Sequence, residues 1–175
     1  LCARGCEVTV LPAYTKPEDI LNGGYDGIML SNGPGDPQEN TEIIENLKVL
    51  TKSGMPIFGI CLGHQLLALS IGAQTKKMTF GHRGVNHPVK DLAHDRTYIT
   101  SQNHGYAVLG ETVNPDIARV SHININDNTC EGIEHLHAPI FTVQYHPEVK
   151  PGPEDTAYLF DQFIALMDEK KGGAQ

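Results

Sequence analysis

Residues 56–65 read Pro-Ile-Phe-Gly-Ile-Cys-Leu-Gly-His-Gln, and this segment decides the expected fold. A short, wholly apolar run such as residues 56–60 is typical of a strand that is buried on both faces of a parallel sheet. A helical pattern follows at once, so Gly-x-Cys-x-Gly lies between a strand and a helix. That order is the nucleophile-elbow pattern, with cysteine in the place of the usual serine. The segment therefore predicts an α/β fold in which Cys61 occupies a sharp strand-to-helix turn.

Cys61 is the candidate nucleophile, because this position would activate a thiol. A sharp elbow strains the backbone of the nucleophile, and the flanking Gly59 and Gly63 would relieve the crowding that larger side chains cause. The dipole of the following helix favours an anion, and such positions can lower a thiol pKa from about 8.5 to about 3.5–7.5. The N–H of Leu62 is placed to donate into an oxyanion hole. The alternative is that Cys61 is a small buried hydrophobic residue, as most cysteines are.

The segment His146-Pro147-Glu148 supplies a candidate base and a group to orient it, and it follows an apolar strand pattern at residues 140–143. Proline favours an extended conformation in the residue before it, which would fix the direction of the imidazole. Side chains two positions apart on an extended chain point to the same side, so Glu148 can accept a hydrogen bond from His146. Such a carboxylate sets the tautomer of the imidazole and stabilises its cation. His-Pro-Glu alone is typical of a surface turn, but beside the elbow it predicts a Cys-His-Glu triad.

Outward from the elbow, apolar strand patterns alternate with helical ones through the first half of the chain. This alternation predicts an α/β fold with a mostly parallel, open sheet flanked by helices. The expected strands are residues 6–11, 25–30 and 56–60, and the expected helices are residues 17–21, 41–52 and 63–71.

The second half changes character, because residues 75–141 contain short strand patterns separated by turns. These patterns predict a smaller antiparallel extension of the sheet. The expected strands are residues 85–89, 96–100, 107–109, 117–122, 130–134 and 140–143. A closing amphipathic helix is expected over residues 156–168. No repeat, low-complexity segment or linker divides the chain, so residues 1–175 are interpreted as one domain.

The composition is that of an ordinary globular protein, with 39% hydrophobic and 19% charged residues. A formal net charge of −8 argues against a nucleic-acid partner, since nucleic-acid binders present basic faces. No apolar run approaches the roughly 18–20 residues that a membrane span needs, so no membrane partner is expected. The cysteines at positions 2, 6, 61 and 130 have no metal-type spacing and predict free thiols in a reducing cytoplasm.

Three separated blocks together resemble the class I, triad-type glutamine amidotransferases, and the resemblance covers nearly the whole chain. The blocks are the elbow at residues 59–65, the turn Asn32-Gly33-Pro34-Gly35-Asp36-Pro37, and Gln144-Tyr145-His146-Pro147-Glu148. Within that class, residues 80–89, 101–108 and 151–156 are similar to the small subunits of carbamoyl-phosphate synthetases.

This resemblance implies that Cys61 is the nucleophile, His146 the base and Glu148 its orienting partner. It implies that the substrate L-glutamine is bound by Gly33, Gly35, Leu62, Gln65, Asn103, Gly105 and Tyr106, with the Gly35 N–H as a second oxyanion donor. The implied reaction is hydrolysis of the glutamine side-chain amide through a cysteinyl thioester. The ammonia would pass to a large synthetase subunit for carbamoyl phosphate synthesis.

The resemblance also bears on partners and on the extent of the chain. No metal or cofactor is expected in this domain, since ATP and Mg²⁺ would be bound by the large subunit. Residues 82–88 and 151–155 are expected to form part of the surface that contacts that subunit. Members of the small-subunit family carry an N-terminal domain and a first strand of the amidotransferase sheet, and we interpret both as missing here. A serine of that domain, which normally helps to bind glutamine, is then missing as well.

Three other functions stay open at this point. The first is an amidotransferase for another synthase, such as one that makes anthranilate or GMP. The second is a γ-glutamyl peptidase that uses the same triad. The third is a non-catalytic regulatory or metal-binding module that uses His82, His87, His94 and His104, although their spacings match no common metal site.

Overall fold

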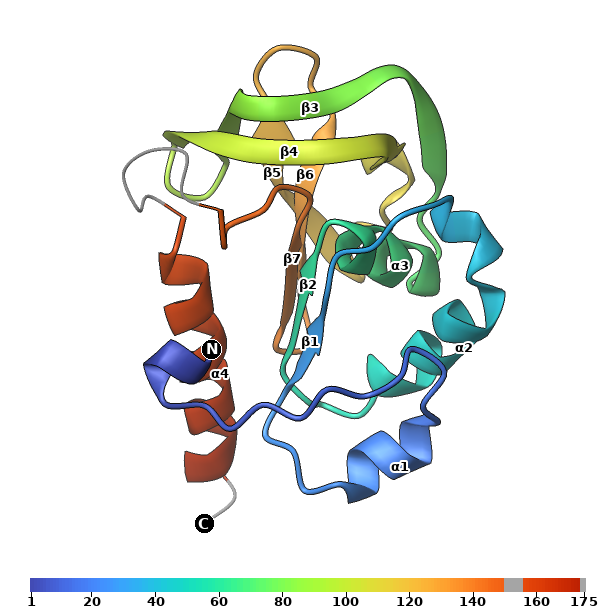
Figure 1. Ribbon diagram of the computed structural model, residues 1–175, viewed down its shortest axis with the longest axis vertical. Coiled ribbons are helices and arrows are strands. Elements are labelled where there is room, and N and C mark those ends of the chain that lie inside the picture. The colour runs from blue at the N-terminus through green and yellow to red at the C-terminus, as the bar shows by residue number, and fades with distance from the viewer. Residues whose placement is uncertain (150–155, 174–175) are drawn as a thin grey trace.

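The computed structural model describes residues 1–149 and 156–173, and Figure 1 shows a mixed sheet with helices packed against it. Within these residues, seven strands lie in the order β1-β2-β7-β6-β4-β3-β5. The strands are β1 (Ile28–Leu30), β2 (Ile57–Ile60), β3 (Thr75–Asp91), β4 (Arg96–Val108), β5 (Ala118–Asn124), β6 (Cys130–His135) and β7 (Ile140–Val143). The α-helices are α1 (Pro17–Asn22), α2 (Thr41–Leu50), α3 (Leu62–Ser70) and α4 (Tyr158–Gly172), and short 3-10 helices span Cys2–Arg4, Pro37–Glu39 and Gly110–Thr112.

The parallel part of the sheet consists of β1, β2 and β7, with α4 on one face and α1 to α3 on the other (Figure 1). Successive side chains of a strand point to opposite faces. Phe58 therefore packs against Phe163 of α4, while Ile57 packs in a second core cluster with Leu67 of α3. Every residue of β2 and β7 is buried, as the wholly apolar pattern of β2 predicted.

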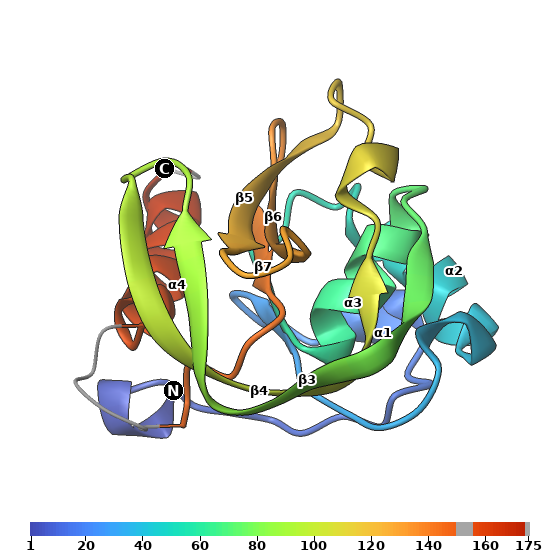
Figure 2. The same ribbon diagram turned by 90° about the horizontal axis from the view of Figure 1, so that it is seen from above.

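The antiparallel part is built around two long strands. β3 and β4 pair over most of their length, with register shifts between Lys77 and His82 and between Gly84 and His87. Figure 2 shows them as a curved ribbon that extends from beside α3 to beside α4. β5 pairs with both β3 and β6, and β6 also pairs with β4. The strands β6, β4, β3 and β5 therefore close into a small barrel.

The predicted α/β class is confirmed, but the sheet is neither mostly parallel nor open, and its antiparallel part is the larger one. Within the described residues only the β1–β2 and β2–β7 pairings are parallel, and the barrel closes one end of the sheet. The patterns at residues 85–89, 96–100 and 107–109 are parts of β3 and β4, not separate strands. Gly81, with a φ of +68°, lies within a register shift that lets β3 continue where the alternation of the sequence fails.

The expected strand at residues 6–11 is not formed. These residues have no strand partner in the described part of the chain, and the side chain of Val10 is 89% exposed. A strand pattern predicts a strand only where a neighbour accepts its hydrogen bonds and covers its apolar side chains.

The helices follow the sequence expectations closely. The predicted helices at residues 17–21, 41–52 and 63–71 correspond to α1, α2 and α3, and the predicted closing helix extends to Gly172 as α4. The expected partner-contact segment at residues 151–155 lies outside the described residues. None of the helices that the structure describes is long and apolar enough to cross a membrane.

Candidate active site

Cys61 joins β2 to α3 through an unusual backbone conformation. Its φ is 53° and its ψ is −105°, a combination that residues other than glycine rarely adopt. A Cβ atom on Gly63 would collide with the main-chain oxygen of Leu30, and one on Gly59 would lie 2.9 Å from Cγ2 of Thr142. The two glycines are therefore required by the close approach of neighbouring strands, while the strained dihedral angles belong to the cysteine itself.

The elbow leaves the thiol at the N-terminus of α3, where Cys61 is the residue that caps the helix. The first N–H groups of a helix have no acceptor within the helix, so the N–H of Leu62 is available to an anion. Cys61 is 5% exposed, and all four cysteines are free. Cys130 is a contrasting case, because burial raises the pKa of its thiol to about 12. Of the two buried cysteines, Cys61 is the one whose setting suits a nucleophile.

His146 reaches Cys61 because both residues follow neighbouring parallel strands. The N–H of Cys61 donates to the main-chain oxygen of Val143, the last residue of β7, at 2.9 Å. The carboxyl ends of β2 and β7 therefore lie side by side, and three residues after β7 the chain comes to His146. The N–H of His146 donates to the main-chain oxygen of Ser101 at 2.9 Å, which ties the loop to β4.

The three residues of the predicted triad interact in the order Cys61, His146, Glu148. Nδ1 of His146 lies 2.8 Å from Oε1 of Glu148. A hydrogen bond with Cys61 and another with Glu148 raise the pKa of His146 to about 10, against the opposing effect of burial. Burial alone would raise the pKa of Glu148, but the hydrogen bond with His146 outweighs it and lowers that pKa. At neutral pH the imidazole is therefore cationic.

The seven residues predicted to bind glutamine lie on three elements around the elbow. Gly33 and Gly35 belong to the turn after β1, Leu62 and Gln65 to α3, and Asn103, Gly105 and Tyr106 to β4. A Cβ atom on Gly33 would lie 2.7 Å from Cδ2 of Leu62, so the turn packs directly against the start of α3. Gln65 is 3% exposed, and its Nε2 donates to the main-chain oxygen of Tyr106 at 2.8 Å.

A pocket of about 390 Å³ opens between the turn after β1 and the β3–β4 pair. Three of the predicted residues line it, namely Gly35, Gly105 and Tyr106. The lining does not include the other four predicted glutamine-binding residues or the triad: Gly33, Leu62, Gln65, Asn103, Cys61, His146 and Glu148. Gly35 has a φ of +98°, and the space beside its Cα is open. The turn after β1 therefore lines one side of the pocket, and Gly105 and Tyr106 of β4 line another.

The pocket also contains charged residues that the sequence did not single out. Asp36, Lys77 and Arg83 line it, and Arg83 donates to the main-chain oxygen of Phe80 at 2.6 Å. Lys77 and Arg83 lie on β3, whose length the sequence patterns concealed. The pairing Arg83↔Asn103 places this part of β3 beside the glutamine-binding segment of β4. The sequence alone does not reveal that β3 pairs with β4 in this register, so it could not predict that Lys77 and Arg83 line the pocket.

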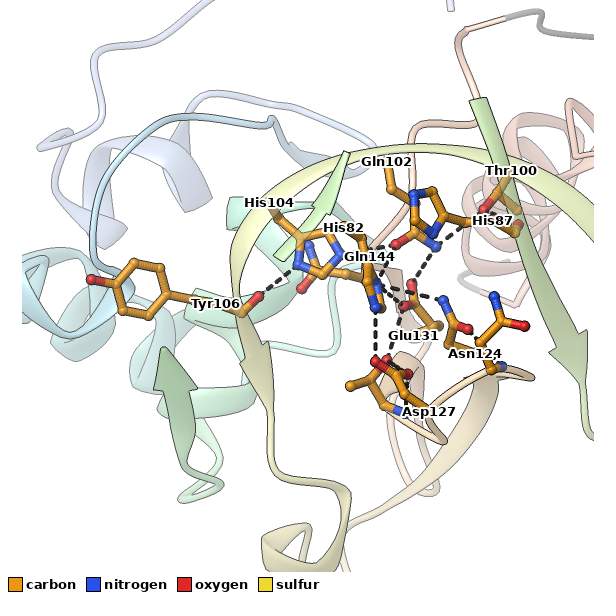
Figure 3. Close-up of polar contacts among 12 residues, drawn as sticks. His82, His87, Thr100, Gln102, His104, Tyr106, Asn124, Asp127, Glu131 and Gln144 are labelled. Atoms are coloured by element: carbon orange, nitrogen blue, oxygen red, sulfur yellow. Dashed lines mark hydrogen bonds and ion pairs between the residues drawn. The ribbon is translucent and has the colours of Figure 1, made fainter. Parts of the chain in front are cut away.

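Four histidines were candidates for a metal-binding module, and three of them, His82, His87 and His104, lie close together in the structure. The ring of His82 lies 4.9 Å, centroid to centroid, from the rings of His87 and His104. His94 is elsewhere, where its Nδ1 lies 2.8 Å from Oδ2 of Asp91. Figure 3 shows His82 and His104 beside Glu131, and one ligand atom from each of these three buried residues lies within 4.8 Å of the other two.

Comparison with known proteins agrees with the geometry. A family model described as glutamine amidotransferase class-I matches residues 1–166. Carbamoyl phosphate synthase small chains of Symbiobacterium thermophilum and Bacillus caldolyticus are 53% and 56% identical over 96% and 97% of this chain. These matches cover 46% and 47% of the relatives' own lengths, so the chain spans about half the length of the curated relatives it matches.

Solved structures share the fold at much lower identity. The first is a protein described as a subunit of GMP synthase, from Thermoplasma acidophilum, with a TM-score of 0.79, 21% identity and coverage of 94% of this chain and 82% of that one. The second is a glutamine amidotransferase from Thermotoga maritima, with a TM-score of 0.61, 17% identity and coverage of 96% and 70%. At these identities the likeness concerns the fold alone.

Proposed function

Because this chain belongs to the class-I glutamine amidotransferase family, we propose that it hydrolyses the side-chain amide of glutamine and delivers the ammonia to a large synthetase subunit. The observation that carries this proposal is the strained Cys61 at the start of a helix, hydrogen-bonded to an imidazole that Glu148 orients. The relatives named carbamoyl phosphate synthase small chain favour carbamoyl phosphate as the product of the partner, over anthranilate or GMP synthesis.

In the first step, the sulfur of Cys61 attacks the side-chain amide carbon of glutamine. The proton of the thiol is held by His146, which Glu148 stabilises as a cation. The carbonyl π electrons move onto oxygen, and the N–H groups of Leu62 and Gly35 are the proposed donors to that oxyanion. Loss of one such donor typically costs a factor of about 10²–10³ in rate, so the backbone of the elbow matters as much as its side chains.

In the second step, the carbon–nitrogen bond breaks and the nitrogen takes the proton from His146, which releases ammonia. The product on the protein is a γ-glutamyl thioester of Cys61. His146 then removes a proton from water, and the resulting hydroxide attacks the thioester carbon. The carbon–sulfur bond breaks, glutamate leaves and the thiolate returns to its place beside the imidazolium. None of these steps needs a metal or cofactor in this chain, and ATP and Mg²⁺ belong to the proposed partner.

The remaining parts of the proposal concern binding and location. Glutamine would occupy the pocket at Gly35, Gly105 and Tyr106. Cys61 does not line this pocket, but the turn that carries Gly35 packs through Gly33 against Leu62, the residue after Cys61. Residues 82–88 would contribute to the surface for the large subunit through residues 83–86, which are exposed, whereas His82 is buried. Four free cysteines favour a reducing, cytoplasmic compartment.

The test is covalent trapping. The purified protein is treated with a glutamine analogue that carries an electrophile in place of the side-chain amide, and the adduct is located by mass spectrometry. We expect one adduct, on Cys61, and protection by added glutamine. Cys130, with its raised pKa and 3% exposure, is the internal control that should stay unmodified. An adduct on any other cysteine, or labelling that glutamine does not slow, would reject the proposal.

A second experiment separates the partner activities. The chain is purified with the large subunit that binds it, and the complex is supplied with glutamine, ATP and bicarbonate. Formation of carbamoyl phosphate supports the assignment. Ammonia release that instead drives amination of a purine or of chorismate, or cleavage of γ-glutamyl peptides without glutaminase activity, would replace it with one of the alternatives.

A further inference from the structure

The interior of the small barrel is filled with polar side chains. A barrel interior is ordinarily filled by packed side chains that are mostly apolar. Here each of the four strands contributes at least one polar residue that is at most 7% exposed. These residues are His82 from β3, Gln102 and His104 from β4, Asn124 from β5 and Glu131 from β6 (Figure 3). Buried polar groups are costly unless they are paired, so their pairing must be accounted for.

His82 is the centre of this polar interior, and both of its ring nitrogens face oxygen atoms. Nε2 lies 2.9 Å from Oδ2 of Asp127, at the turn between β5 and β6. Nδ1 lies 2.8 Å from Oε1 of Gln102 and 3.2 Å from Oε1 of Glu131. Carboxylate and amide oxygens accept hydrogen bonds, so both nitrogens must carry protons to satisfy these contacts. The imidazole is then a cation held between two carboxylates.

The pKa values of His82 and Asp127 agree with this charge state, whereas burial outweighs the contacts with His82 and raises the pKa of Glu131. Burial alone would lower the pKa of His82, but Glu131 and Asp127 outweigh it and raise that pKa to about 9. Hydrogen bonding to Thr129 and His82 lowers the pKa of Asp127 against the effect of burial. Glu131 is fully buried, so it would lack its counter-charge if His82 were removed.

The network continues from His82 to the wall of the pocket. Oε1 of Gln102 lies 2.9 Å from Nε2 of His104, and Nδ1 of His104 lies 2.7 Å from the main-chain oxygen of Tyr106. Burial and the neighbouring His82 lower the pKa of His104 to about 4, so its ring is neutral and donates its single N–H to one of these two oxygens. The main-chain oxygen of Tyr106 accepts the hydrogen bond from Gln65 of the nucleophile helix. Alternation along β4 directs Gln102 and His104 into the barrel, and leaves Gly105 beside the pocket. Contacts that run from His82 through Gln102 and His104 to Tyr106 therefore support the part of β4 that lines the pocket, on the side facing the barrel interior.

We propose that His82 is a positioning residue for substrate binding: with Glu131 and Asp127 it holds Gln102 and His104, and thereby fixes the main chain of Gly105 and Tyr106 at the pocket. This inference rests on the proposed glutaminase function. His82 does not touch the reacting atoms, so its loss should weaken glutamine binding more than it slows the chemical step.

A metal ion is the competing interpretation of the same atoms. Asp127 and the Tyr106 carbonyl contact the outer nitrogens of His82 and His104, as partners of metal-bound imidazoles do. Ligands at about 2.0–2.1 Å from a tetrahedral zinc ion lie roughly 3.3 Å apart. The 3.2 Å between Nδ1 of His82 and Oε1 of Glu131 is close to that spacing. Oε1 of Gln102, however, lies 2.8 Å and 2.9 Å from the two imidazole nitrogens, and these shorter distances match hydrogen bonds. The distances thus favour a hydrogen-bonded network.

The test measures glutamine hydrolysis by variants of the purified protein, together with its partner subunit where one co-purifies. We expect His82→Ala to raise KM for glutamine about tenfold or more while kcat changes by less than about threefold. His82→Asn places an amide nitrogen near the position of Nδ1, which faces Gln102, and should restore part of the lost affinity. His122→Gln is the matched control, since this histidine of β5 is also 7% exposed but its ring contacts Ser121 and Tyr145.

The outcomes separate the inference from the proposed function. A wild-type protein that does not hydrolyse glutamine contradicts the proposed function. A normal wild type with folded His82 variants whose KM is unchanged, or with His122→Gln raising KM equally, overturns only the positioning role. If His82→Ala does not fold, Glu131→Gln takes its place, with a raised KM as the expected result. Stoichiometric zinc in the wild type, whose removal by a chelator raises KM, would show that the site is a metal site and that the hydrogen-bonded network is wrong.

Discussion

The two halves of the sheet differ in how much polar material they bury. Between the parallel strands and their helices the core is apolar, as at Phe58, Ile57 and Val143. The antiparallel barrel instead encloses a hydrogen-bonded group around His82 and Glu131. The candidate active site lies where the halves meet, with the nucleophile and base on the parallel half and the pocket wall on the barrel. The strained backbone of Cys61 thus positions the nucleophile on the parallel half, and the buried polar side chains position the pocket residues of β4 on the barrel.

The largest expected effect is on the parallel side. Cys61→Ala removes the nucleophile, so we expect glutamine hydrolysis to fall by about 10⁴-fold or more, because the triad acts as a unit. The measurement is ammonia or glutamate release under saturating glutamine. Circular dichroism should show an unchanged fold, since alanine keeps the Cβ atom. Activity within about tenfold of the wild type would mean that the elbow is structural.

Gly63→Ala tests whether the elbow depends on close packing. The new Cβ would collide with the main-chain oxygen of Leu30, so β1 or α3 must shift. We expect a loss of about 2–4 kcal/mol in the free energy of unfolding, measured by urea titration. Gly172→Ala is the control, since a Cβ there meets nothing within 4 Å and should change stability by no more than about 1 kcal/mol. Equal effects of the two substitutions would contradict the packing argument.

The pH dependence of stability tests the barrel side. Glu131 and Asp127 raise the pKa of His82 from 6.5 to about 9, so the folded state binds its proton more tightly than the unfolded state does. The resulting stability is fully present below about pH 6.5 and is lost as the pH rises through about 9. The groups that face His82 are those two carboxylates and the rings of His87 and His104.

The free energy of unfolding of the wild type should exceed that of His82→Asn by about 1–3 kcal/mol less at pH 9.5 than at pH 6. Urea titrations of the two proteins at each pH give this difference directly. A difference that stays constant across the range would mean that His82 is neutral in the folded protein, contrary to the contacts of both its nitrogens.

The smallest expected effect isolates the strain at the elbow. Glycine tolerates the φ of 53° at position 61 better than alanine does. Cys61→Gly should therefore be more stable than Cys61→Ala by about 1 kcal/mol, after the entropic cost of glycine in the unfolded chain is subtracted. Thermal unfolding of the two inactive variants gives the comparison. An alanine variant that equals or exceeds the glycine variant would indicate that the elbow is not strained.

The amino-acid sequence by itself determined the local structure around the elbow. The helices, the buried strand β2 and the sharp turn at Cys61 follow from short-range patterns, because capping, periodicity and glycine placement act over a few residues. The order Gly-x-Cys-x-Gly and His-Pro-Glu identified the three residues that the structure joins. The failed strand at residues 6–11 marks the limit, since a strand also depends on its neighbours.

Only the tertiary structure decided the rest, because it depends on pairing between distant segments. The length of β3, the closure of the barrel and the place of Arg83 beside Asn103 all follow from register, which no short window of sequence contains. The contact of His146 with Cys61 follows from the parallel pairing of β2 with β7, which sets Ile60 beside Val143 although the two are far apart in the sequence. Buried polar contacts such as His82 with Glu131 are likewise decided by which strands close the barrel.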